Sequence, residues 1–151
     1  MDNLPRILLA EDNPEDIELI LAAFREINLA NEIFITRNGE ELLDYLCYRG
    51  QFTNRQKGYP AVILMDIKMP KIDGLEALKI IKSDPDLKII PVVILTSSSM
   101  ESDLIRSYHL GVNAYVVKPV NFDRFVLAIK EIGLFWAILN QIPSDQNRKK
   151  S

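Results

Sequence analysis

Short apolar runs alternate with segments of helical periodicity along this chain. Ile17, Ile20 and Phe24 recur at intervals of three and four residues, which is the spacing of one face of a helix. The run 61–65 is apolar at every position and follows Pro60, as expected for a short strand that is buried on both faces. The two patterns therefore predict strands and helices that follow one another in turn.

This alternation extends over most of the chain. Strands are predicted at 6–10, 32–37, 61–65, 89–95 and 113–117, and helices at 14–28, 39–47, 75–82, 103–110 and 121–140. Alternating strands and helices favour a doubly wound parallel sheet with helices on both faces. With short right-handed crossovers, the expected strand order is 2-1-3-4-5, that of a flavodoxin-like (βα)5 fold of the α/β class. The segment 50–58 is polar and has no periodicity, so it is predicted to be a loop without a chemical role.

Capping residues mark the starts of the first and last helices. Asn13 is a suitable N-cap and Pro14 a suitable first helical residue. Glu15 and Asp16 follow in the first turn, where negative charge complements the helix dipole. Asn121 is the corresponding N-cap of the final helix.

Polar side chains stand where four of the predicted strands end. Glu11 and Asp12 follow the first strand, Asp66 the third, Thr96 the fourth and Lys118 the fifth. In open α/β sheets, ligands bind outside the carboxyl ends of the strands. In the order 2-1-3-4-5 the third strand lies between the first and the fourth. We therefore expect the three acids and Thr96 to converge, and the long side chain of Lys118 to reach them from one strand further away.

Three carboxylates gathered at one edge of a sheet repel one another, and each disfavours the ionisation of its neighbours. A hard divalent cation relieves this repulsion, and an all-oxygen site with few protein ligands suits Mg²⁺. An ammonium group and a hydroxyl beside such an ion are suited to holding a phosphoryl group. Because an Asp carboxylate can form a covalent phosphate intermediate, Asp66 is predicted to accept a phosphoryl group.

Composition narrows the expected class of protein. A length of 151 residues and a hydrophobic content of 48% are ordinary for one globular domain. The net charge of −3 gives no reason to expect a nucleic acid or an anionic membrane surface as partner. Cys47 is the single cysteine, which excludes an intrachain disulfide and fits a reducing compartment. Neither a signal peptide nor an apolar run of membrane-spanning length is seen, so a cytoplasmic protein is expected.

Four sequence blocks at the ends of the predicted strands resemble a known family. The blocks are Leu8-Leu9-Ala10-Glu11-Asp12-Asn13, Leu64-Met65-Asp66-Ile67-Lys68-Met69-Pro70 with Asp73-Gly74, Pro91-Val92-Val93-Ile94-Leu95-Thr96 and Tyr115-Val116-Val117-Lys118-Pro119. Together, and in this order, they are similar to the receiver domain of two-component response regulators. The resemblance covers residues from about 5 to 140 and implies a CheY-like receiver domain at 1–142, followed by a polar tail at 143–151.

The resemblance also implies the role of each acidic residue. Asp66 would accept a phosphoryl group from a phosphohistidine on a sensor histidine kinase. The carboxylates of Glu11, Asp12 and Asp66 would hold Mg²⁺, together with the backbone carbonyl of Lys68. The chain would then be a phosphoacceptor that signals to a downstream protein, without enzyme activity toward other substrates.

Further positions of the same blocks imply a conformational switch. Lys118 would contact a phosphoryl oxygen, and Pro119 corresponds to a position where the family has a cis peptide. Thr96 would move to hydrogen-bond the phosphoryl group, and Tyr115 would turn inward into the space that is vacated. The resulting change would reach the outer face formed by the fourth helix, the fifth strand and the fifth helix.

Three features outside these blocks narrow the resemblance. The long loop at 50–58, the stretch 83–87 and the pair Phe135-Trp136 are similar to the small single-domain response regulators of cyanobacterial and bacterial phytochromes. A phytochrome kinase is therefore one candidate for the phosphodonor.

Each candidate residue also has a plainer interpretation. By itself Asp66 would be a cap or turn residue, Lys118 an exposed lysine and Tyr115 an aromatic that packs on a helix. A phosphatase of the haloacid-dehalogenase type needs a second Asp two residues after the nucleophile, where this chain has Lys68. A flavodoxin-like nucleotide-binding protein would need a phosphate loop after the first strand, where Glu11 and Asp12 would repel phosphate. A receiver-like domain that only binds partners is disfavoured by the intact acidic, Thr and Lys positions.

The final predicted helix is apolar around most of its circumference. Leu127 and Phe135 lie off the stripe of residues expected to face the sheet. A helix of this kind is either covered twice or meets a partner. We therefore expect a homodimer through the fifth strand, the final helix and the segment with Phe135 and Trp136, the alternative being that the polar tail covers these side chains.

Overall fold

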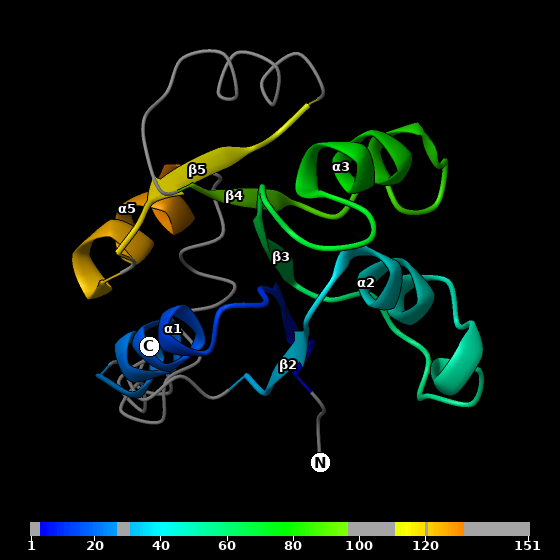
Figure 1. Cartoon of the computed structure of the whole chain (residues 1–151), viewed down its shortest axis with the longest axis horizontal. Coiled ribbons are helices and arrows are strands. Elements are labelled where there is room, and N and C mark those ends of the chain that lie inside the picture. Colours follow the sequence, from blue (N-terminus) through cyan, green and yellow to red (C-terminus); the bar gives the residue numbers. More distant parts are fainter. Residues whose placement is uncertain (1–3, 27–30, 97–110, 120, 132–151) are drawn as a thin grey trace, which may run out of the picture.

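The computed structural model describes residues 4–26, 31–96, 111–119 and 121–131, which form an open sheet flanked by helices (Figure 1). The strands are β1 (Ile7–Ala10), β2 (Ile33–Thr36), β3 (Val62–Asp66), β4 (Val92–Thr96) and β5 (Ala114–Val117). The helices are α1 (Pro14–Glu26), α2 (Gly39–Leu46), α3 (Gly74–Ser83) and α5 (Phe122–Glu131), with a 3₁₀ turn, η1, at Gly50–Phe52.

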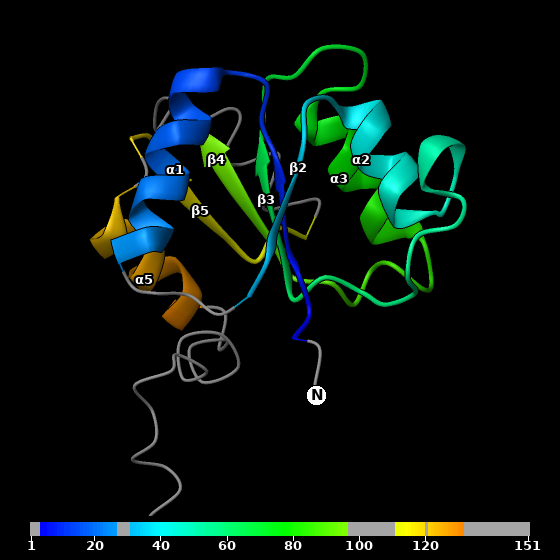
Figure 2. The same ribbon diagram turned by 90° about the horizontal axis from the view of Figure 1, so that it is seen from below.

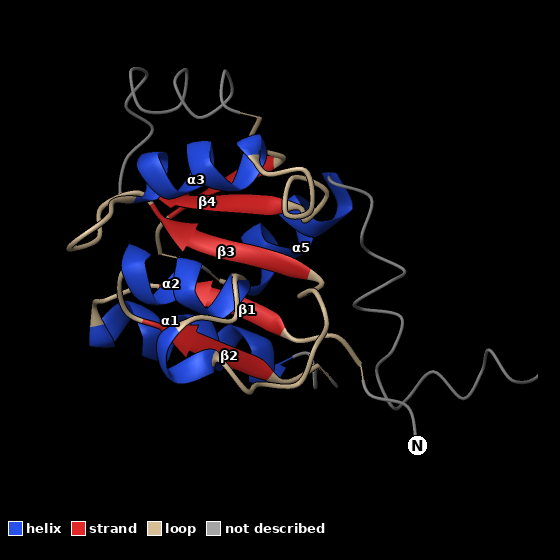
Figure 3. Cartoon of the chain, turned by 90° about the vertical axis from the view of Figure 1, so that its right-hand side faces the viewer, coloured by secondary structure: helices blue, strands red, loops and turns tan. Residues whose placement is uncertain are grey.

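The sheet has the predicted order β2-β1-β3-β4-β5, and every neighbouring pair of strands is parallel. Figure 3 shows the strand arrows pointing the same way behind α2 and α3. All residues of β1, β3 and β4 are buried, whereas the edge strands β2 and β5 are partly exposed. The prediction of an α/β fold with this strand order is therefore confirmed.

Helices cover the two faces of the sheet in pairs, as Figure 2 shows edge-on. On one face, Ile7, Leu9 and Leu64 belong to a core cluster that includes Phe24 of α1 and Phe125 of α5. On the other face, alternate residues of the same strands pack against the apolar sides of α2 and α3. Each central strand thus contributes side chains to two cores, which explains its continuous apolar sequence. Within the described ranges, no helix is long and apolar enough to span a membrane.

Asparagine side chains cap three helices, two of them at the predicted positions Asn13 and Asn121. Oδ1 of Asn13 accepts hydrogen bonds from the backbone N–H groups of Glu15 and Asp16. Asn38 caps α2 in the same way, and Asn121 accepts from the backbone N–H of Arg124 at the start of α5. The helix expected at 103–110, the part of the final helix beyond 131 and the tail at 143–151 lie outside the described residues.

The fourth strand begins later than the apolar pattern predicts. Residues from Ile89 were expected to belong to it, but β4 starts at Val92. Ile89 is 65% exposed, and the backbone N–H of Ile90 bonds to the carbonyl of Leu87 within a turn. Pro91, which has no N–H to give to a neighbouring strand, separates this turn from the strand.

The segment 50–58 is more ordered than its polar composition suggested, so the prediction of a plain loop was wrong in part. Its η1 turn buries Phe52, whose ring packs edge-on against Phe34 of β2 and Tyr45 of α2. The guanidinium of Arg55 lies 4.0 Å from the ring centres of both Tyr45 and Tyr48. An aromatic cluster therefore fastens this segment to the end of α2.

Replacing Phe52 with Ala should destabilise the whole domain, since it removes the anchor of the 50–58 segment. A buried Phe→Ala change costs about 3 kcal/mol of unfolding free energy, because it loses apolar burial and leaves a cavity. Urea denaturation measures the loss, with Gln51→Ala in the same turn as an exposed control. Equal stability of the Phe52 variant and the control would show that η1 does not support the fold.

Candidate functional site

The strand register brings the predicted acidic residues to one edge of the sheet. Ala10 of β1 pairs with Met65 of β3, so the next residues, Glu11 and Asp66, stand at the same level on neighbouring strands. Asp66 in turn pairs with Leu95, which places Thr96 one residue further along β4. The convergence of Glu11, Asp66 and Thr96 at this edge follows from the parallel register alone.

Glu11 is fully buried, which is unusual for a carboxylate. Burial is the largest influence and raises the pKa of Glu11 to about 7. The Lys118 ammonium lowers this pKa, the negative charge of Asp66 raises it, and a hydrogen bond from the backbone N–H of Asn13 lowers it. The protein therefore holds a carboxylate in a place where its negative charge is costly unless positive charge lies close by.

Three carboxylates at this edge are close enough to share one cation. Glu11, Asp12 and Asp66 each offer an oxygen, and these oxygens lie within 4.8 Å of one another. Oε1 of Glu11 accepts no hydrogen bond of good geometry from the described residues, although it is shielded from water. A buried oxygen without such a bond, in an all-oxygen donor set, fits a hard divalent cation. The predicted metal ligands are thus brought together.

Lys118 supplies the positive charge that lies next to these carboxylates. It follows β5, and a cis peptide bond joins it to Pro119. Its Nζ lies 2.8 Å from Oε1 of Glu11, 2.9 Å from Oδ2 of Asp16 and 3.2 Å from Oδ2 of Asp66. Burial of the ammonium lowers its pKa, but the contacts with these carboxylates outweigh burial and hold the pKa of Lys118 above its usual range. Lys118 is therefore charged and directed into the acidic cluster.

Asp16 is the residue of this site that sequence reasoning missed. Its place in the first turn of α1 was explained by the helix dipole alone, yet its carboxylate also binds Lys118. A signal was available, because α1 begins directly after Glu11 and Asp12 at the edge where Lys118 was expected. The contact spans 102 residues of sequence, however, and only the packing of α1 against α5, the helix that follows Lys118, brings the two residues together.

Gly74 holds the loop that follows β3 close to the backbone of Asp66. The backbone N–H of Gly74 bonds to the carbonyl of Ile67 at 2.6 Å. A side chain at position 74 would collide with the backbone carbonyl of Asp66, so only glycine permits this approach of α3. The backbone N–H of Lys68 lies 3.4 Å from Oδ1 of Asp66. A metal contact from the Lys68 carbonyl stays a prediction.

An open cavity lies beside the acidic cluster. Its volume is about 590 Å³, and Asp12, Lys68 and Met69 contribute to its lining. The side chain of Asp66 is only 11% exposed, whereas Asp12 is exposed. A small donor molecule can therefore approach the cluster from the side of the loop that follows β3.

The two predicted switch residues occupy different environments. Thr96 ends β4, is 6% exposed, and accepts at its carbonyl a 2.7 Å hydrogen bond from the backbone N–H of Lys118. Tyr115 of β5 is half-buried and packs against the core cluster on the α2 and α3 face. Their movement stays a prediction, and Phe135 and Trp136 lie outside the described residues.

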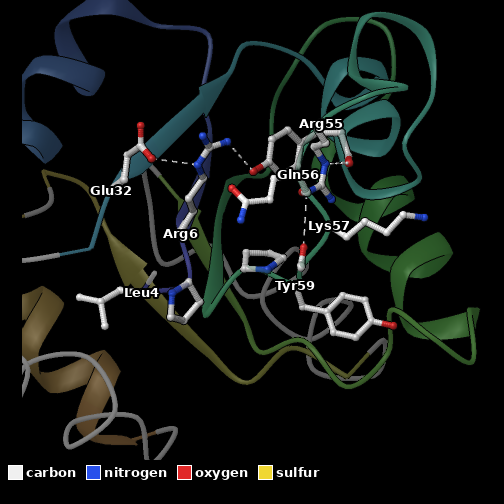
Figure 4. Close-up of a pocket in the computed structure, with 11 residues that line it drawn as sticks. Leu4, Arg6, Glu32, Arg55, Gln56, Lys57 and Tyr59 are labelled. Carbon is white, nitrogen blue, oxygen red and sulfur yellow. Dashed lines mark hydrogen bonds and ion pairs between the residues drawn. The ribbon is translucent and has the colours of Figure 1, made fainter. Parts of the chain in front are cut away.

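A second cavity, of about 470 Å³, lies at the opposite end of the sheet (Figure 4). The guanidinium of Arg6 points into it and bonds to Glu32 on one side and to the Tyr45 hydroxyl on the other. Arg55 donates to the backbone carbonyls of Tyr45 and Gln56. Both guanidinium groups therefore take part in hydrogen bonds that hold the wall of this cavity together.

Fold and site together define an α/β domain with a cluster of acidic residues at the carboxyl edge of its parallel sheet. The family model of the response regulator receiver domain matches residues 7–130. The chain therefore belongs to the response regulator receiver family.

Several relatives of known name are similar over most of their length. Response regulator Rcp1 of Synechocystis sp. is 38% identical over 138 residues, which are 91% of this chain and 92% of Rcp1. The bacteriophytochrome response regulator AtBRR is 55% identical in its solved structure, with a TM-score of 0.85 over 93% of this chain and 100% of that chain. The resemblance to single-domain response regulators of phytochromes is thereby confirmed.

Two cyanobacterial relatives have solved structures in a phosphorylated and in a Mn²⁺-bound form. The phosphorylated phytochrome response regulator RcpA is 41% identical, with a TM-score of 0.74 over 88% of this chain and 94% of that chain. The Mn²⁺-bound form of Rcp1 is 37% identical, with a TM-score of 0.70 over 87% of this chain and 93% of that chain.

Binding of Mg²⁺ should stabilise the protein, because a cation relieves the repulsion among Glu11, Asp12 and Asp66. At a concentration of 100 times Kd the unfolding free energy should rise by about 2.7 kcal/mol. Thermal unfolding with Mg²⁺ or with a chelator measures this gain. Asp12→Asn should lose most of it, while Glu18→Gln, an exposed change on α1, should keep it. A gain that survives in Asp12→Asn would place the cation elsewhere.

Proposed function

We propose that this protein is a single-domain response regulator in which Asp66 accepts a phosphoryl group from a sensor histidine kinase. The observation that supports this most directly is the position of Asp66. It ends the central strand, lies beside two further carboxylates and pairs with Lys118. A cluster of this composition at the carboxyl end of a parallel sheet suits phosphoryl transfer, in which positioning and charge neutralisation are the main tasks.

The transfer uses Asp66 as a nucleophile. A carboxylate oxygen of Asp66 attacks the phosphorus of a phosphohistidine, the P–N bond breaks, and the imidazole leaves with its electron pair and takes up a proton. The product is an acyl phosphate on Asp66. The cavity beside Asp12 and Lys68 gives the donor its approach. The protein acts as a phosphoacceptor rather than on other substrates.

The proposed cofactor is Mg²⁺, held by the carboxylates of Glu11, Asp12 and Asp66 and by the backbone carbonyl of Lys68. When bound, it neutralises charge on the phosphoryl oxygens and on the three carboxylates. The relative Rcp1 has a Mn²⁺-bound form, which supports a divalent cation in this family. Small, hard Mg²⁺ suits a donor set of so few protein oxygens.

Phosphorylation would change the edge of the sheet that β5 forms. Lys118 contacts a phosphoryl oxygen, Thr96 moves toward the phosphoryl group, and Tyr115 turns inward. Thr96 and Tyr115 stand on adjacent strands, since Ile94 pairs with Tyr115 and Thr96 with Val117. The face formed by the fourth helix, β5 and α5 is the surface that changes, and a downstream protein binds it.

The proposed phosphodonor is a phytochrome-type histidine kinase. The names of RcpA and AtBRR associate those relatives with phytochromes. The receiver domain would extend over 1–142, with 143–151 as a polar tail.

Incubation with Mg²⁺ and acetyl phosphate should add one phosphoryl group to the protein, because a small donor can replace the kinase when the site is assembled. Intact-mass measurement reports the adduct. Asp66→Asn should abolish it, and Asp86→Asn, which removes an exposed carboxylate from a turn, should leave it unchanged. Absence of an adduct with acetyl phosphate and with a phosphorylated histidine kinase would refute the proposal.

We further propose a homodimer through β5, α5 and the segment with Phe135 and Trp136. Within the described residues, Leu127 of α5 is 66% exposed, the largest exposure among the large hydrophobic side chains of the helices. It lies on the side of α5 opposite to Phe125 and Ala128, which are buried against the sheet. An exposed Leu on the face that carries the signal suits a self-association surface.

Leu127→Asp should weaken dimerisation by at least about tenfold, since it would bury a charge in an apolar contact. Sedimentation velocity over a concentration series, with and without phosphorylation, measures the effect. Leu19→Asp on α1 is the matched control, because Leu19 is also exposed, at 48%. A wild-type protein that stays monomeric at high concentration in both states would contradict the dimer.

A further inference from the structure

The contacts of Lys118 differ in kind as well as in distance. The contact with Oδ2 of Asp16, at 2.9 Å, has the geometry of a hydrogen bond. Oε1 of Glu11 is slightly closer, at 2.8 Å, and forms an ion pair with the same ammonium although it is fully buried. The ammonium is therefore shared between α1 and the buried carboxylates.

Asp16 stands outside the group of carboxylates that could share a cation. That group consists of Glu11, Asp12 and Asp66, which follow β1 and end β3. Asp16 lies on the first turn of α1, and the exposed fraction of its side chain is 26%, against 0% for Glu11. Asp16 contacts the site through Lys118. It can keep this ion pair when a cation binds to the other carboxylates.

We propose that Asp16 is a positioning residue, which shares the Lys118 ammonium with Glu11 and Asp66 and so leaves more of their negative charge to a divalent cation. This inference rests on the proposed function, because it concerns the same cation site and the same acceptor.

The Lys118 ammonium divides one positive charge among its partners. A lysine has three N–H donors, which Asp16, Glu11 and Asp66 share. Without the Asp16 carboxylate, the ammonium would pair with Glu11 and Asp66 alone. It would then neutralise more of the negative charge that attracts a cation. Asp16 also keeps Nζ at a fixed place, from which it can contact a phosphoryl oxygen once Asp66 carries one.

The test is the affinity for Mg²⁺ itself, measured by calorimetry without any phosphodonor. Asp16→Asn should bind Mg²⁺ about tenfold more weakly, the usual effect of removing a group that orients metal ligands. Asp16→Glu restores a carboxylate that can reach Lys118 and should bind close to wild type. Glu15→Gln removes a charge from the same turn of α1 and should also bind close to wild type, which separates positioning from net charge.

A double-mutant cycle decides whether Asp16 acts through Lys118. In a Lys118→Met background, Asp16→Asn should have no further effect on Mg²⁺ affinity, because the group it positions is gone. Circular dichroism checks that each variant is folded, and Asp16→Ser takes the place of any unfolded Asp16→Asn protein. The inference is overturned by wild-type affinity in Asp16→Asn, by an equal loss in Glu15→Gln, or by an undiminished loss in the Lys118→Met background.

The same proteins distinguish this inference from the proposed function. If wild-type protein forms no adduct with a phosphodonor, while the Mg²⁺ affinities follow the expected series, then Asp66 is not the acceptor and Asp16 still positions Lys118. If the adduct forms on Asp66 and the affinities do not follow the series, the acceptor stands and the role of Asp16 is rejected.

Discussion

The interaction on which this structure depends is the contact between the Lys118 ammonium and the carboxylates of Glu11, Asp16 and Asp66. A fully buried Glu11 next to Asp66 would be strongly unfavourable without positive charge close by. One ammonium cannot neutralise all the carboxylates of the cluster. The protein therefore keeps an excess of negative charge at one edge of its sheet, and this charge is the physical reason to propose a cation there.

This charged edge is supported by an apolar structure that leaves it little freedom. The strands that carry Glu11 and Asp66 are buried throughout, and the parallel register fixes the level of one acid against the other. Gly74 allows α3 to press against the backbone of Asp66 and Ile67. Buried strands and a tightly packed loop therefore hold the backbone of Asp66 in place.

The two ends of the sheet have opposite characters. At the carboxyl ends of the strands, acids gather around one lysine beside an open cavity. At the other end, Arg6 bonds to Glu32 and Arg55 to a backbone carbonyl, and the aromatic rings of Tyr45 and Phe52 fasten the 50–58 segment to α2. Negative charge thus gathers at the Asp66 edge, while guanidinium groups and aromatic rings hold the opposite end together.

The sequence by itself determined the class of fold, the strand order and the identity of the main site residues. Burial on both faces makes a central parallel strand apolar at every position, and the residue that follows such a strand must lie at the edge of the sheet. Local patterns of this kind predicted the positions of Glu11, Asp66, Thr96 and Lys118. They also predicted the caps at Asn13 and Asn121, because a cap is a contact between residues close in sequence.

Tertiary structure alone decided which groups meet across the chain. The ion pair between Asp16 and Lys118 depends on the packing of α1 against α5, and no local pattern encodes it. Burial of Phe52 in a polar segment depends on Phe34 and Tyr45, which belong to other elements. The late start of β4 depends on a turn in which the backbone N–H of Ile90 donates a hydrogen bond to the carbonyl of Leu87. The first two contacts join residues that are distant in sequence, and in the third a turn uses a backbone N–H that a strand would need. The periodicity of apolar residues contains no information on either.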